Sequence, residues 1–179
     1  VGSDGVASAA ILLSMQTILS AFYSGYVQGI APVISYHYGA RNEDNLKKCH
    51  HIGKYTIYVL SVLTFVLAFP LARPMALLFA NGQDTVLRLS IHGIYCSSSC
   101  FLFMGINFFA SSFFTALNNG KVSALLSFFR SFVFLLLPLV TLPFLIGVDG
   151  VFYSLPIAEF LSLLLSIFVF RRYRTRYHY

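Results

Sequence analysis

The sequence predicts an all-α protein, a polytopic membrane bundle of five transmembrane helices that forms a single membrane domain. The 179 residues are 58% hydrophobic and only 10% charged, with a mean hydropathy of +0.77. An average soluble domain is about 45–50% apolar and about 25% charged. The charges divide the chain into five apolar stretches, each longer than the run of about 18 residues that marks a spanning helix. Strand-like alternation is absent, which argues against a barrel.

The first apolar stretch, about residues 5–40, contains no charged residue after Asp4. At about 1.5 Å per residue it exceeds the hydrocarbon core of about 30 Å, so it has to tilt, kink or protrude. Pro32 is the natural place for a kink. Ala21, Gly25 and Gly29 lie four apart, a spacing that permits close helix contact. The other predicted spans are about residues 55–80, 89–117, 122–146 and 151–170, followed by a tail at 171–179.

The positions of Lys and Arg predict the orientation of these spans. Nine of the twelve basic residues occur in the 41–54 loop, at Lys121 after the third span, and in the tail from Arg171 to Arg176. With five spans, these three places fall on one side. The sequence therefore predicts a multi-pass plasma-membrane protein with a cytoplasmic carboxy terminus. The net charge of +6 lies at the edges of apolar runs, which argues against nucleic-acid binding.

Arg130 and Glu159 are the most informative pair, because ionisable groups inside spans are costly and mark pathways or paired contacts. Arg130 lies nine residues from Lys121, and Glu159 lies twelve residues from Arg171. These spacings place them roughly 13 Å and 18 Å from the same end, within about one helical turn in depth. Two interpretations stay open. The pair is a structural ion pair, or Glu159 exchanges a proton or meets a cation in a central cavity while Arg130 holds it ionised.

Polar residues in the first and third spans are further candidates. Pro32 leaves a backbone carbonyl without its helical partner, so that region should face protein or a water-filled cavity. In the third span, cavity lining and interhelical hydrogen bonds are equally good interpretations of the polar patches, which include residues 96–100. The candidate residues for a cavity, substrate or ion site are Gln28, Pro32, Ser35, Tyr36, Asn107, Ser111, Arg130 and Glu159.

The sequence offers no set of catalytic residues, so an enzyme is disfavoured. Cys49-His50-His51 lacks further ligands at suitable spacing, and we expect neither a metal site nor a bound cofactor. Three cysteines, two of them in an apolar segment, imply no disulfide framework.

Four segments of the chain, taken together, have an order and spacing that are specific for one protein family. Residues 25–42 contain Gln28-Gly-x-x-Pro32-x-x-Ser35 followed by Tyr38-Gly-Ala, and the other segments are 105–121, 127–138 and 147–159. The first resembles the end of a long helix in the MATE (multidrug and toxic compound extrusion) family. The others resemble the family's tenth, eleventh and twelfth helices.

The resemblance implies a twelve-helix antiporter with two six-helix lobes, of which this chain would be helices eight to twelve of the carboxy-terminal lobe. It would be a fragment, and the missing amino-terminal lobe would be its partner. Some family members carry an acidic cation-site residue in the tenth helix. The third span here has no Asp or Glu, which leaves Glu159 as the intramembrane acid.

The predicted function is secondary active antiport by alternating access, exporting organic cations, drugs or other toxic compounds in exchange for Na⁺ or H⁺ as coupling ion. The predicted partners are a small-molecule substrate and the lipid bilayer. Two alternatives remain. One is a lipid-linked oligosaccharide flippase of the same superfamily, which a cavity rich in Arg and Lys would favour. The other is a membrane scaffold subunit that transports nothing.

Overall fold

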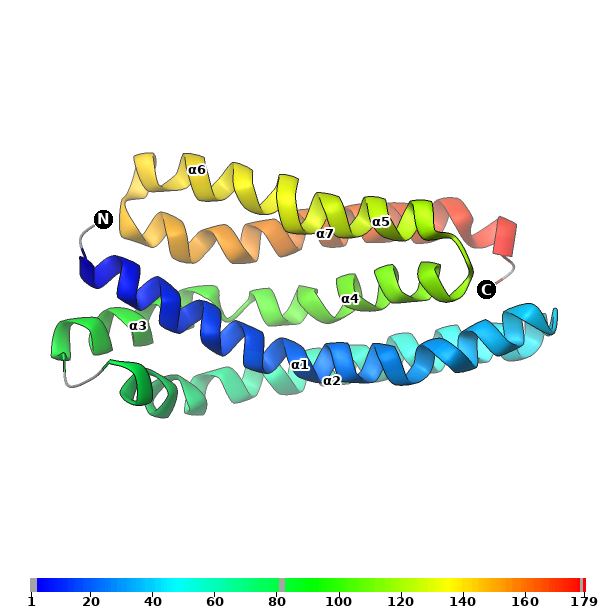
Figure 1. Cartoon of the computed structure of the whole chain (residues 1–179), viewed down its shortest axis with the longest axis horizontal. Helices are drawn as coiled ribbons and strands as arrows, with labels where there is room; N and C mark the ends of the chain where they lie inside the picture. Colours follow the sequence, from blue (N-terminus) through cyan, green and yellow to red (C-terminus); the bar gives the residue numbers. More distant parts are fainter. Residues whose placement is uncertain (1–2, 81–82, 178) are drawn as a thin grey trace.

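The computed structural model describes residues 3–80, 83–177 and 179, and these residues form an all-α bundle, as the sequence predicts. The elements lie along one long axis (Figure 1). In chain order they are α1 (Ser3–Gly39), α2 (Glu43–Phe79), α3 (Asp84–Ser97), α4 (Cys100–Ala116), α5 (Gly120–Phe128), the π-helix η1 (Phe129–Val133), α6 (Phe134–Ile146) and α7 (Val148–Tyr177).

Among the described residues, four helices are long and apolar enough to cross a membrane: α1, α2, the run Gly120–Ile146 and α7. The helices α3 and α4 meet at a bend of 57°, and counting them as one broken span gives the predicted five. At the bend, the hydroxyls of Ser97 and Ser98 donate to the carbonyls of Gly93 and Tyr95, at 2.8 and 2.9 Å. These two serines of the polar patch at residues 96–100 therefore bond to their own helix backbone.

The helices α2 and α7 extend furthest beyond the predicted spans. The helix α2 begins at Glu43, twelve residues before the predicted span, and Asn42 caps it by accepting a hydrogen bond from the backbone N–H of Asn45. The helix α7 continues through the basic segment to Tyr177. Lys and Arg are good helix formers, so the helices continue past the apolar runs. Residues 81 and 82, before α3, lie outside the described part of the chain.

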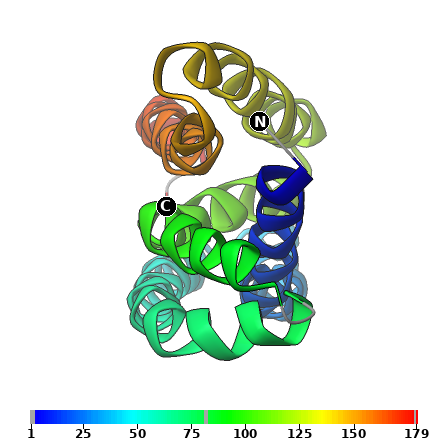
Figure 2. The ribbon, with the colours of Figure 1, turned by 90° about the vertical axis from the view of Figure 1, so that its left-hand side faces the viewer.

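The helix α4 lies at the centre of the bundle and contacts α1, α2, α5 and α7, an arrangement visible end-on in Figure 2. Its Phe109, Phe113 and Phe114 are fully buried. The helix α2 meets it through small residues: a Cβ added at Gly53 would lie 2.7 Å from the Phe109 ring. Small residues at helix contacts are typical of membrane bundles because they let backbones approach closely.

The predicted small-residue strip on α1 makes no such contact within this chain. Ala21, Gly25 and Gly29 are exposed, and a Cβ added at either glycine would meet nothing within 4 Å. The strip therefore makes no close helix contact with the described residues of this chain. The strip belongs to an outward face of α1.

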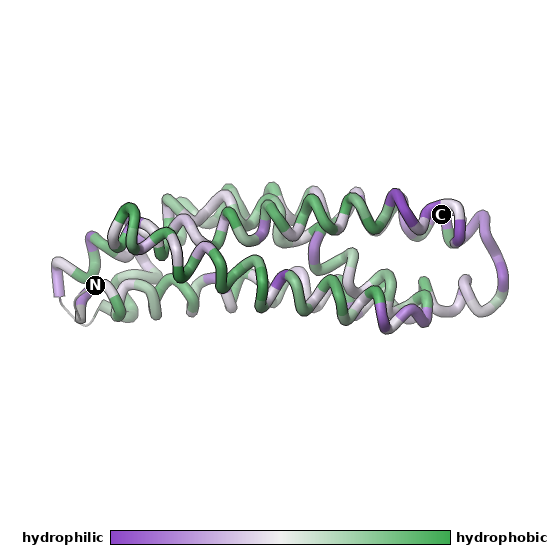
Figure 3. The backbone as a smooth tube through the Cα atoms, turned by 90° about the horizontal axis from the view of Figure 1, so that it is seen from above, coloured by the Kyte–Doolittle hydropathy of each residue, from purple (hydrophilic) through white to green (hydrophobic). Residues whose placement is uncertain are grey.

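The two chain termini lie at opposite ends of the bundle (Figure 1). One end carries the α1–α2 connection, the α4–α5 connection and the carboxy terminus, so the three basic segments lie together, as the orientation argument requires. Figure 3 shows hydrophobic residues along the helices and hydrophilic segments toward the ends.

Candidate functional site

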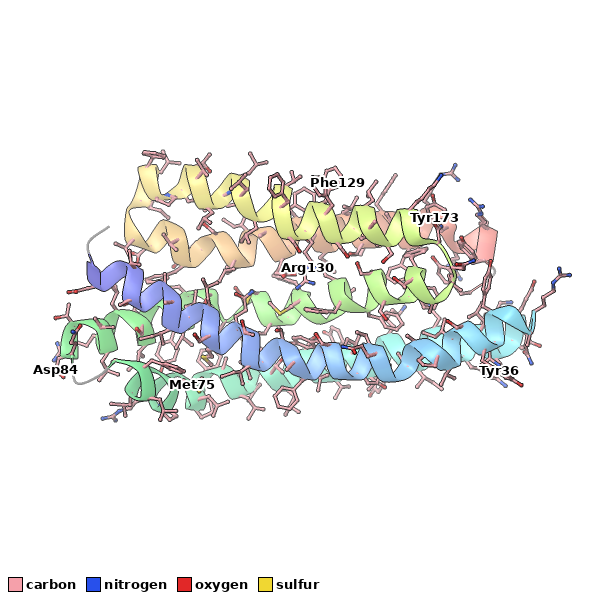
Figure 4. The ribbon with its side chains drawn as sticks, in the orientation of Figure 1. Tyr36, Met75, Asp84, Phe129, Arg130 and Tyr173 are labelled. Carbon is pink, nitrogen blue, oxygen red and sulfur yellow. The ribbon has the colours of Figure 1, made fainter. Side chains whose placement is uncertain are left out.

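Arg130 and Glu159 form an ion pair inside the bundle. The guanidinium donates from Nη2 to Oε1 of the carboxylate at 2.9 Å, and from Nε to Oε1 and Oε2 at 3.0 and 3.2 Å. The two side chains are 19% and 7% exposed. Figure 4 shows Arg130 lying between the α5–α7 layer and α4. The contact predicted from the depths of the two residues is therefore made.

Arg130 lies in the π-helix η1, which interrupts the helical run from Gly120 to Ile146. Such single-turn π segments are rare and occur frequently at functional sites, where the extra residue changes the direction of the neighbouring side chains. The guanidinium carbon of Arg130 lies 4.1 Å from the centre of the Phe108 ring on α4. This cation–π contact and the Glu159 carboxylate together hold the arginine on the inner side of its helix.

Asn107 of α4 completes the site. Its Nδ2 donates to Oε2 of Glu159 at 2.7 Å and to the backbone carbonyl of Glu159 at 2.9 Å. Its Oδ1 accepts a hydrogen bond from Ser166 at 3.0 Å. The network Arg130–Glu159–Asn107–Ser166 therefore joins η1, α7 and α4, and its acid is satisfied by one charged and one neutral donor.

The sequence reasoning named three of these four residues and missed Ser166. The signal for it was available, because Ser166 follows Glu159 by seven residues on one helix and so lies on the same face. Sequence reasoning also missed a polar contact beside the site. The hydroxyl of Tyr23 on α1 bonds to Thr64 on α2 and donates to the carbonyl of Phe101 at 2.9 Å.

The Tyr23 ring stacks on Phe108 with 6.1 Å between ring centres. Phe108 in turn lies under the guanidinium of Arg130. A continuous set of contacts therefore connects α1 and α2 to the ion pair on the other side of α4. Packed contacts of this kind can transmit a change at the pair to distant helices.

Two of the other candidate residues make interhelical hydrogen bonds. Ser111 on α4 shares a hydrogen bond of 2.8 Å with Ser127 on α5, and its carbonyl accepts one of 2.9 Å from Ser123. Ser35 on α1 donates to the carbonyl of Ala116 at the end of α4, at 2.9 Å. Both serines make helix-to-helix contacts, and neither has a hydrogen bond to the Arg130 network among the described residues.

The remaining candidates, Gln28, Pro32 and Tyr36, are exposed on α1, and α1 continues through Pro32 as one helix. Tyr36 is 72% exposed and lies near the end of α1 (Figure 4). Within the described residues, no hydrogen bond joins these three side chains to the ion pair. They share the outward face of α1 with Gly25 and Gly29.

The cysteines Cys49, Cys96 and Cys100 are free. The described part of the chain holds no group of three or more His, Cys, Asp or Glu residues that could bind a metal ion.

Comparisons with known proteins agree with the fold. The family model MatE matches residues 1–140. The chain is similar to the "Multidrug export protein MepA" of Staphylococcus aureus strains MSSA476 and MW2, each 24% identical over 175 residues, which are 98% of this chain and 38% of that protein.

A solved structure has the same fold, with a TM-score of 0.91 at 16% identity over 99% of this chain. It is described as the outward-facing conformation of a multidrug resistance MATE family transporter of the MOP superfamily. The chain covers 40% of that structure. It therefore spans about two fifths of the length of the relatives that it matches.

Proposed function

The chain belongs to the MatE family, and from this premise we propose that it forms helices eight to twelve of a secondary active antiporter. The proposed cargo is an organic cation, drug or other toxic compound, and the coupling ion is Na⁺ or H⁺. The relatives named as multidrug exporters support this class of cargo. The proposed location is the plasma membrane, with the basic end of the bundle in the cytoplasm.

The observation that carries the proposal is the buried Arg130–Glu159 pair with its neutral donor Asn107. Charges at this depth cost free energy unless they are paired and hydrogen-bonded. A proton on Glu159, or Na⁺ at its oxygens, would compete with the donors that now hold the carboxylate. Arg130 would then release Glu159, and the contacts between η1, α4 and α7 would rearrange.

Transport follows if this rearrangement favours one of two conformations of the whole transporter. A ligand shifts such an equilibrium by the difference in its affinity for the two states. In alternating access, one lobe moves against another around a central site. We assign the exposed face of α1, with Gln28, Pro32 and Tyr36, to the surface that meets the second lobe or the cargo.

The test is efflux of a cationic dye by the complete transporter under an imposed proton or Na⁺ gradient. Glu159→Gln keeps the size of the side chain and removes its charge, so we expect gradient-driven efflux to be lost. Asp149→Asn is the matched control, because Asp149 is an exposed acid at the start of the same helix. It should retain efflux at the wild-type level.

Protein amount in the membrane has to be equal in both variants. The double variant Arg130→Gln/Glu159→Gln removes the stranded charge of Arg130 and separates folding from coupling. Unchanged gradient dependence in Glu159→Gln, at wild-type protein levels, would overturn the assignment of Glu159.

The flippase alternative requires cationic groups for a pyrophosphate. At mid-depth Arg130 is the available cation, and Glu159 already neutralises it. The scaffold alternative predicts no gradient-dependent efflux of any dye in the wild type. The same assay therefore separates it from the antiporter.

A further inference from the structure

The basic end of the bundle contains a pocket of about 680 Å³ between α2, α4 and α7. Four cationic side chains line it, two from each outer helix: Lys47 and Lys54 of α2, and Arg171 and Arg174 of α7. No Asp or Glu lies among its lining residues, and within the described residues none of the four cations forms an ion pair. The side chains that line the pocket therefore carry a net positive charge.

The inner part of the pocket is apolar, with Ile106 of α4 and Ile167 and Phe170 of α7 among its lining. On both outer helices, the exposed surface changes from basic to aromatic residues beside the pocket. On α2, Lys54 is followed by the exposed Tyr55, which is 67% exposed. On α7, the exposed Phe168 precedes Arg171. Tyr and basic residues gather at the level of lipid headgroups, so the pocket spans the boundary between headgroups and acyl chains.

We propose that this pocket binds an anionic phospholipid of the cytoplasmic leaflet. The phosphodiester lies among the four cations, and the first part of an acyl chain lies along the apolar wall. Basic pockets between transmembrane helices on the cytoplasmic side bind anionic headgroups in this way. A zwitterionic lipid carries its own cation, which the pocket's charge repels. The proposal rests on the proposed orientation of the chain and not on antiport.

The pocket wall also contains a polar atom that lacks a partner. His50 lies among aromatic rings, with its ring centre 4.6 Å from Tyr179 and 4.9 Å from Phe113. Its Nε2 is buried and makes no hydrogen bond to any described residue. Buried polar atoms are nearly always paired in folded proteins.

The bound lipid would hold α2 and α7 together, because each helix contributes two of the cations. Tyr179 closes the same region, because its hydroxyl donates to the carbonyl of Phe170 at 3.0 Å. We therefore expect a lipid-dependent increase in thermal stability as well as binding.

The test measures retention of phosphatidylglycerol and of phosphatidylcholine by the purified complete protein, using native mass spectrometry and thermal unfolding in mixed micelles. The variant Lys54→Gln/Arg171→Gln removes one cation from each side of the pocket. The control Lys48→Gln/Arg172→Gln removes the same net charge from the same helices at positions that do not line the pocket. All four side chains are exposed, so both variants should fold.

We expect the pocket variant to lose about tenfold or more of its affinity for phosphatidylglycerol, and the control to stay close to the wild type. The charge-preserving variant Lys54→Arg/Arg171→Lys should retain binding. Equal losses in pocket variant and control would show diffuse charge attraction and overturn the proposal.

Two further results would also overturn it. One is retention of phosphatidylcholine as strong as that of phosphatidylglycerol. The other is equal stabilisation by inorganic phosphate alone, which would indicate an anion site without a lipid. Neither measurement uses a gradient or a cargo, so its failure is distinct from failure of the antiport proposal.

Discussion

Asn107 on α4 donates from a single nitrogen to both the carboxylate and the backbone carbonyl of Glu159 on α7, at 2.7 and 2.9 Å. Arg130 occupies the other side of the carboxylate. Both carboxylate oxygens therefore already face donors. A proton or a metal cation at this acid would have to displace one of them, which is the step that the proposed coupling requires.

Asn107→Leu should destabilise the protein. The substitution removes two hydrogen bonds to Glu159 and the acceptor of Ser166 while keeping a similar volume. Leaving buried polar groups unsatisfied costs about 1–3 kcal/mol each. Thermal unfolding of the purified protein in detergent measures this. Ser111→Ala, on the same helix but outside the network, should cost less than half as much, and equal losses would contradict a special role for Asn107.

Arg130→Gln should be more damaging than the double change Arg130→Gln/Glu159→Gln. Removing one partner of a buried pair leaves an uncompensated charge and costs about 3–5 kcal/mol. Neutralising both residues removes that charge. A double-mutant cycle on the midpoint of thermal unfolding measures the difference. Strictly additive effects of the two single changes would mean that the pair is not coupled in the folded protein.

Gly150→Ala should weaken the contact between α6 and α7. An added Cβ there would lie 2.5 Å from the backbone carbonyl carbon of Leu142, which cannot move like a flexible side chain. Overpacking of this kind costs about 1–3 kcal/mol. Gly120→Ala at the start of α5 is the control, because its Cβ meets nothing within 4 Å and alanine is the better helix former. The midpoint of thermal unfolding should fall for Gly150→Ala and stay unchanged or rise for Gly120→Ala.

The orientation can be tested with single cysteines in a variant of the complete protein that lacks its natural cysteines, among them Cys49, Cys96 and Cys100. Thr175→Cys lies on the basic end of α7, and Thr85→Cys lies near the start of α3 at the opposite end; both positions are exposed. A membrane-impermeant maleimide should label Thr85→Cys in intact cells and Thr175→Cys only in inverted vesicles. The reverse pattern would place the basic end outside and remove the basis of the lipid site.

Helix content and axial position were predictable from sequence. Long apolar runs require helices in lipid because every backbone polar group must be bonded within the segment. Depth is set by the rise per residue, so the spacings from Lys121 and Arg171 are enough to bring Arg130 and Glu159 to one level.

Which side of each helix lies against the core could not be predicted in the same way. A helix in a soluble protein buries its apolar side, so hydrophobic periodicity marks the core. In lipid both the inner and the outer faces are apolar, so hydrophobic periodicity no longer marks the side that faces the core. The spacing of the α1 glycines therefore predicts packing, although they face outward, while Gly53 of α2 lies against Phe109.

By itself the sequence determined that the chain is a helical membrane bundle with its basic segments at one end and two opposite charges at one depth. The tertiary structure decided which faces meet, that the third span is bent at Ser97 and Ser98, and that Asn107 and Ser166 complete the ion pair. The physical reason is that composition and rise per residue act along the chain, whereas helix rotation depends on packing between segments far apart in sequence.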